Sequence, residues 1–240
     1  MFIWLFLFFI SVILLPSTVF AWGPVTHIYL GSEVYFMGAA ISPSIYALLR
    51  KFRQDYLYGN IMADIIFAKK YLPREKNPHN WDVALELLDA AETEPERAFV
   101  LGYMSHLAAD TVAHTRYTKG RKNLSHSILE LQAESLIDRH YWFLALSIGE
   151  DVQKRGDILL KRCLESPFFS FKTNKRILKG IVLMSGLRHA GSQKLFYSAA
   201  PDPKLIEGLH EESLDRMLDV LEKGRRSRVL KKDPTGGFLK

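Results

Sequence analysis

Apolar residues recur at intervals of three and four along most of the chain, which is the pattern of amphipathic helices. The pattern is clear over residues 177–187 and 205–221. Helix starts are indicated at Ser42, which precedes a proline, and at Thr93, where Glu96 completes a capping box. No segment shows the strict alternation of a β-strand. The sequence therefore predicts an all-α, single-domain bundle of several helices.

The first 21 residues have the composition of a signal peptide. Residues 2–15 are apolar, a stretch shorter than the roughly 20 residues that span a bilayer. Cleavage after Ala21 would make Trp22 the first residue of an exported protein, periplasmic or secreted, with a free α-amine that can bind metal once deprotonated. Because the segment lacks basic residues at its start, retention as an N-terminal membrane anchor is the alternative.

Composition sets further limits on the mature chain. The remaining 219 residues can bury a substantial core, and we assign residues 22–224 to one helical domain. Cys163 is the single cysteine, so no intramolecular disulfide can form. The net charge of +6 favours anionic partners, either a membrane surface or nucleic acid. Residues 225–240 are predicted to be a mobile basic tail that contacts an anionic membrane peripherally or only adds solubility. No obligate protein partner is indicated.

Three potential metal ligands follow one another at helical spacing. His106, Asp110 and His114 are each four residues apart, so on a continuous helix they form one polar stripe within an apolar segment. Buried imidazole and carboxylate groups need partners, and zinc prefers these ligands. The alternative is three unrelated core residues that are satisfied by hydrogen bonds.

Other segments contain further potential ligands. His126 and Glu130 are also four apart, although Glu130 could instead form a capping box with Ser127. Asp64 lies in an apolar segment where an unpaired carboxylate would be unfavourable, and His79 lies in a loop just before a predicted helix. Three other histidines lack partners at ligand spacing and are assigned structural roles: His140, His189 and His210.

Five segments, taken in order, resemble the zinc-dependent phospholipase C family: residues 22–27, 59–64, 77–82, 102–110 and 126–130. This family includes the catalytic domain of glycosylphosphatidylinositol-specific phospholipase D and is related to single-strand-specific nucleases. The resemblance covers residues 22 to about 135 and implies an all-helical fold around a trinuclear zinc site. It implies one zinc on Asp64, His79, His106 and Asp110, a second on His114, His126 and Glu130, and a third on the Trp22 amine and carbonyl, His27 and a bridging Asp110.

The same resemblance implies a function. Asp110 and His114 are separated by three residues, as in the phospholipase D-like branch, whereas bacterial phospholipases C and the nucleases usually have five. We expect a zinc-dependent phosphodiester hydrolase, most simply a phospholipase C-type enzyme in which a zinc-activated water attacks and Asp64 orients or deprotonates that water. A single-strand-specific nuclease or other phosphoesterase, and a non-enzymatic metal-binding envelope protein, are the alternatives.

Overall fold

The computed structural model describes residues 22–66, 72–117, 133–164, 169–190 and 202–235. Every regular element in these ranges is helical, which confirms the all-α prediction. None of these helices is long and apolar enough to cross a bilayer. The longer helices are α2 (Pro24–Glu33), α3 (Pro43–Lys51), α4 (Arg53–Met62), α5 (Trp81–Ala90), α6 (Glu94–Val112), α8 (Arg139–Leu146), α9 (Glu150–Cys163), α10 (Phe171–Ala190) and α11 (Pro203–Lys223). The short segments are η1 (Gly38–Ala40), η3 (Arg74–Lys76), η4 (Ala113–Tyr117), η5 (Gly224–Arg226) and η6 (Arg228–Lys231).

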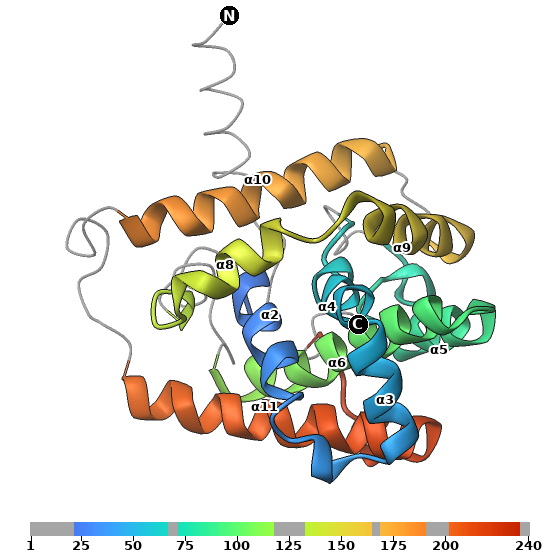
Figure 1. Ribbon diagram of the computed structural model, residues 1–240, viewed down its shortest axis with the longest axis horizontal. Coiled ribbons are helices and arrows are strands. Elements are labelled where there is room, and N and C mark those ends of the chain that lie inside the picture. The colour runs from blue at the N-terminus through green and yellow to red at the C-terminus, as the bar shows by residue number, and fades with distance from the viewer. Residues whose placement is uncertain (1–21, 67–71, 118–132, 165–168, 191–201, 236–240) are drawn as a thin grey trace, which may run out of the picture.

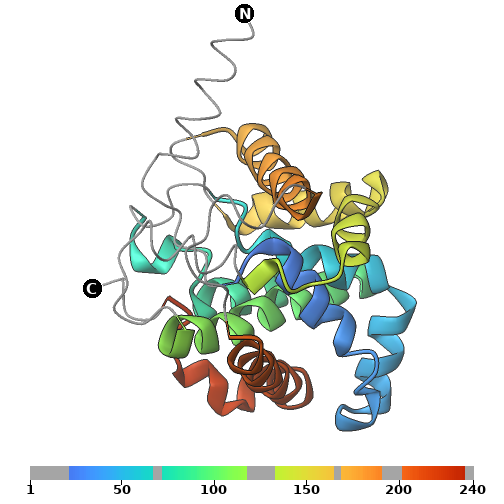
Figure 2. The same cartoon turned by 90° about the vertical axis from the view of Figure 1, so that its left-hand side faces the viewer.

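Helix α6 is the central element of the fold. Its start carries the predicted capping box, in which the Thr93 side chain accepts from the Glu96 amide and the Glu96 carboxylate accepts from the Thr93 amide. From Ala98 to Val112 every residue of α6 is buried, as expected for a helix surrounded by other helices. Helices α4 and α11 make the most extensive contacts with it. In both views α10 and α11 lie at opposite sides of the molecule, with α2, α4 and α6 between them (Figures 1 and 2).

Two glycines allow α4 and α6 to approach each other closely. A Cβ atom on Gly59 would lie 1.9 Å from the Phe99 carbonyl oxygen, and one on Gly102 would lie 2.0 Å from the Tyr56 carbonyl oxygen. Neither position can hold a larger residue unless the helices separate, because the obstacle is backbone. The close contact brings the end of α4 against the middle of α6, where the polar cluster described below lies.

The basic segment that begins at Arg225 packs against the rest of the protein over most of its length. It contains part of η5 and all of η6, and Val229 is buried. The Trp81 indole at the start of α5 donates a hydrogen bond to the Lys232 carbonyl oxygen at 2.8 Å. Ser227, also buried, donates to Asp219 of α11. The predicted tail of residues 225–240 therefore includes a segment with defined contacts up to Thr235.

Candidate metal centre

A cluster of imidazole and carboxylate side chains lies buried where α2, α4, α5 and α6 meet. His27 comes from α2, and Asp64 follows the end of α4. His79 precedes α5, and both His106 and Asp110 lie on α6. All five residues are buried, although titratable side chains are normally exposed. The structure thus brings together five of the nine metal ligands that the sequence predicted.

The ligand atoms of this cluster face one another. The Nε2 atoms of His79 and His106 are 3.1 Å apart. Asp110 Oδ2 lies 3.0 Å from His79 Nε2 and 3.2 Å from His106 Nε2. Its other oxygen, Oδ1, lies 3.2 Å from His27 Nε2. Asp64 Oδ1 lies 3.3 Å from His79 Nε2. Two overlapping groups therefore have the spacing of a metal site: His27 with His106 and Asp110, and Asp64 with His79 and His106.

These distances fit zinc. Ligand atoms about 2.1 Å from a tetrahedral zinc ion lie roughly 3.4 Å from one another, close to the separations seen here. Among the described residues, His27 Nδ1 is buried without a hydrogen-bond partner, and His27 Nε2 and both Asp110 oxygens are buried with only other potential ligand atoms of the cluster nearby. Unsatisfied buried polar atoms are unfavourable in a protein interior, so a cation among them would remove the penalty. The donor set of imidazole nitrogen and carboxylate oxygen is the one that zinc prefers.

Neighbouring groups orient the ligands. The Asn60 carbonyl oxygen lies 2.7 Å from His106 Nδ1, so this nitrogen carries the proton and donates, which leaves Nε2 to face the cluster. The loop that carries His79 is held in two places. The Tyr103 hydroxyl donates to the Pro78 carbonyl oxygen at 2.5 Å, and the His79 amide donates to Asn77 Oδ1 at 2.8 Å. The centre is therefore fixed by its surroundings as well as by its own members.

The pKa values of His27, His106 and Asp110 are shifted by burial and by the charges of neighbouring members of the cluster. Burial, together with the neighbouring His106, lowers the pKa of His27, which favours the neutral ring that can bind metal. Burial lowers the pKa of His106 as well, but the charges of Asp110 and Asp64 outweigh it and raise the pKa above its usual value. Burial opposes ionisation of Asp110, yet His106 and His27 overcome it and hold the pKa well below the usual range. Asp110 is therefore ionised, and each of its two carboxylate oxygens could bind a metal ion.

The other predicted ligands have different positions. Trp22 is fully buried directly before α2, one turn from His27. His114 is buried in the π-helical segment η4, which continues α6 beyond Val112, and it belongs to neither metal-type group among the described residues. The continuous α-helical stripe that was predicted over positions 106 to 114 therefore does not extend to its last member. π-helical turns often occur at functional sites. His126 and Glu130 lie outside the described residues.

Two residues that sequence reasoning did not select contribute to this region. Glu134 is buried, and its Oε1 accepts a hydrogen bond from the Val25 amide at 2.8 Å, at the start of α2. No spacing signal connects it with the N-terminal segment, because the contact joins distant parts of the chain. Asn60 contributes through its backbone carbonyl oxygen, so the residue type at position 60 gave no signal for the contact.

Comparison with known proteins agrees with this geometry. The family model for zinc-dependent phospholipase C matches residues 26–175, which is more than half of the chain. The chain belongs to the zinc-dependent phospholipase C family. Neither the search of curated proteins nor the search of solved structures returned a match. All five clustered residues lie within the matched range, whereas Trp22 and helix α11 lie outside it.

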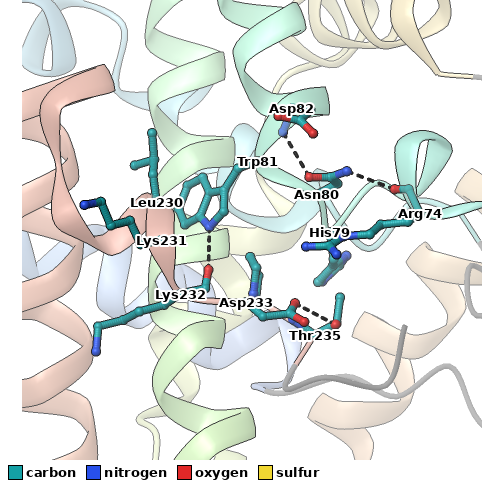
Figure 3. Close-up of a pocket in the computed structure, with 11 residues that line it drawn as sticks. Arg74, His79, Asn80, Trp81, Asp82, Leu230, Lys231, Lys232, Asp233 and Thr235 are labelled. Atoms are coloured by element: carbon teal, nitrogen blue, oxygen red, sulfur yellow. Dashed lines mark hydrogen bonds between the residues drawn. The ribbon is translucent and has the colours of Figure 1, made fainter. Parts of the chain in front are cut away.

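A cavity of about 180 Å³ adjoins the centre of this phospholipase C-family domain. His79 contributes to its wall, together with Arg74, residues 80–82 and the C-terminal segment 230–235 (Figure 3). The Arg74 guanidinium has no ion-pair partner among the described residues and extends towards His79, whereas the Lys231 and Lys232 side chains extend to the opposite side. The C-terminal wall, residues 230–235, lies outside the range that the family model matches.

Proposed function

We propose that the protein is an exported zinc-dependent phosphodiester hydrolase of the phospholipase C type that acts on phospholipids. The observation that carries the proposal is the buried cluster of His27, His106 and Asp110 with Asp64 and His79, whose ligand atoms lie within 4.8 Å of one another in each group. Membership of the zinc-dependent phospholipase C family supports the choice of metal and reaction. The apolar leader of residues 2–15 supports export, with Trp22 as the first mature residue.

The chain has the ligands for clustered metal ions. Asp64, His79 and His106 would hold one zinc ion, and His27 with Asp110 would contribute to another. When bound, zinc supplies Lewis acidity, which binds phosphate oxygens and lowers the pKa of a coordinated water towards about 7. The Asn60 carbonyl holds His106 in the tautomer that directs Nε2 to the centre. No serine or cysteine nucleophile is required for this chemistry.

Asp64 is assigned the role of orienting the attacking water and accepting its proton. Both oxygens of Asp110 are closely engaged, because each lies within 3.2 Å of at least one imidazole nitrogen. Asp64 approaches the same kind of nitrogen less closely, at 3.3 Å from His79 and 3.9 Å from His106. His79 also lines the cavity, so the Asp64 carboxylate lies beside the histidine that faces the space assigned to the substrate, where a general base would act.

We assign to the cavity beside His79 the binding of the part of the substrate that lies beyond the phosphate. Its position next to a ligand of the centre allows one molecule to contact both. Arg74 would then bind anionic oxygen, since a guanidinium matches phosphate geometry. Two other lining residues are held by hydrogen bonds of their own: the Asn80 side chain accepts from the Asp82 amide at the start of α5, and the Trp81 indole donates to the Lys232 carbonyl oxygen.

The test is substrate cleavage by the zinc-loaded mature protein. We expect phosphocholine release from phosphatidylcholine vesicles, and loss of that activity with a strong chelator and recovery with added zinc. In Asp64→Asn the helical circular dichroism spectrum should persist while turnover falls by about two to four orders of magnitude. Nucleotide release from single-stranded DNA without lipid cleavage would identify a nuclease instead. Full zinc content with neither activity would refute the enzymatic assignment.

A matched control is Asp55→Asn. Asp55 is another buried carboxylate of the same region, but it binds Arg155 at 3.0 Å and does not contact the centre. This variant should lose stability and keep its turnover per folded molecule. Equal losses of turnover in the two variants would show that Asp64 has only a structural role.

A further inference from the structure

The side chain of Trp22 is held by the C-terminal helix α11. The indole is fully buried, and its Nε1 donates a hydrogen bond to Ser213 Oγ at 3.3 Å. The Ser213 hydroxyl donates its own proton to the Leu209 carbonyl oxygen at 2.8 Å, so its oxygen is set as an acceptor towards the indole. The His210 ring meets the indole edge-on, with 5.0 Å between ring centroids. Ser213 and His210, one turn apart on α11, therefore both contact the Trp22 indole.

The backbone that follows Trp22 contacts the Glu134 side chain. A Cβ atom on Gly23 would lie 2.2 Å from Glu134 Oε1, so the carboxylate occupies the space that any larger residue would need. The same oxygen accepts the Val25 amide hydrogen, one of the donors that a helix start leaves without an intrahelical partner. The Gly23 carbonyl oxygen in turn accepts from the His27 amide at 3.2 Å. Trp22 is thus connected rigidly to a member of the cluster.

We propose that Ser213 and His210 are positioning residues for an N-terminal metal ligand: they hold the Trp22 indole so that the α-amino group of the mature chain stays beside His27 at the centre. The proposal rests on the proposed function, in which Trp22 is the first residue and its amine binds zinc. It assigns a role to α11, which lies outside the range matched by the family model. A chain terminus is ordinarily mobile, and anchoring its side chain removes conformational freedom that metal binding would otherwise have to overcome.

The decisive experiment is a double-mutant cycle on metal affinity. Mature protein that starts at position 22 is prepared as wild type, Trp22→Phe, Ser213→Ala and the double variant, and the weakest-bound zinc is titrated against a chromogenic chelator. Trp22→Phe keeps the α-amine and an aromatic ring but removes the indole N–H donor. We expect each single variant to bind this zinc about fivefold to tenfold more weakly, and the double variant to be no weaker than either.

Two comparisons separate positioning from a general loss of stability. Ser227→Ala removes another buried hydroxyl, which binds Asp219 instead of Trp22. It should lower the melting temperature without changing zinc affinity. His210→Ala should weaken zinc binding, whereas His210→Phe, which keeps a ring against the indole, should restore most of it.

The last comparison changes the N-terminus by adding one residue before Trp22. In a chain with one extra residue before Trp22 the amine is displaced, so Ser213→Ala should no longer alter zinc affinity. If the extended wild type binds zinc as tightly as the mature wild type, the amine is not a ligand, and that part of the proposed function fails together with the inference. If mature wild type binds more tightly than the extended chain but Ser213→Ala and Trp22→Phe keep full affinity, the inference alone is overturned.

Discussion

His79 and His106 point their Nε2 atoms at each other across 3.1 Å, although 27 positions separate them in the sequence. His106 donates from Nδ1 to the Asn60 carbonyl, so in the neutral ring its Nε2 carries a lone pair. An imidazole lone pair at this distance needs a proton or a cation opposite it. The pair therefore lies at the centre of the cluster, where these two histidines would hold a metal ion in place of a proton.

The first prediction follows from that pair. His106→Ala should lose metal from both groups, because His106 is their common member, while His79→Ala should affect one group more than the other. Mass spectrometry of the native protein would count the ions retained. His140→Ala is the control, since His140 is exposed and contacts Asp138 outside the cluster. Equal metal content in His106→Ala and wild type would remove this histidine from the ligand set.

The second prediction concerns the close contact of α4 and α6. Gly102→Ala should destabilise the protein by about 3 kcal/mol, because the new Cβ meets the Tyr56 carbonyl, which is backbone and cannot rotate away. Gly208→Ala on α11 is the matched control. A Cβ there meets nothing within 4 Å, so the change should stabilise by about 0.5 to 1 kcal/mol. Chemical denaturation measures both, and a neutral Gly102→Ala would contradict the packing described.

The third prediction concerns substrate binding in the cavity beside His79. Arg74→Gln should raise KM for an anionic phosphodiester by about threefold to tenfold and leave kcat nearly unchanged, because the guanidinium binds substrate outside the reacting centre. Lys231→Gln removes the same charge from a side chain that extends away from His79 and should leave KM unchanged (Figure 3). Parallel shifts in both variants would indicate a general effect of surface charge.

The fourth prediction is a pH dependence of stability due to His210. Burial lowers the pKa of His210 from 6.5 to about 4. The unfolded chain therefore takes up this proton more readily than the folded chain, so the contribution of His210 to stability falls as the pH drops from about 6.5 to about 4, by up to about 3 kcal/mol in all. His210→Phe cannot titrate and should show a smaller loss over this range in urea denaturation. Identical pH profiles would show that His210 is protonated in the folded protein.

Much of the helical framework could be predicted from local pattern. The capping box at Thr93 and the Asn80 cap of α5 depend on neighbours within three residues, and both are present. The periodic segments at 177–187 and 205–221 lie within α10 and α11. Local rules suffice for these features because their hydrogen bonds close within one helical turn.

Helical spacing alone predicted only part of the site, because His27 and His79 were assigned as ligands through the resemblance to the zinc-dependent phospholipase C family. The four-residue interval placed His106 and Asp110 on one face of α6, but it did not show that the helix changes to π geometry before His114. The roles of Glu134, Ser213 and His210 depend on tertiary contacts with the segment at Trp22. No local pattern records such contacts, and His210 was accordingly assigned a structural role.

The hydrogen bond from Trp22 to Ser213 joins positions 191 apart in a chain of 240 residues. We expect a contact of such high sequence separation to form late in folding, because closing a long loop costs conformational entropy that is offset only once the contacts have formed. Translation has to reach α11 before the residues that contact the Trp22 indole exist. A chain that stops before α11 would thus contain the histidines and carboxylates of the cluster but lack the contacts that hold the Trp22 indole.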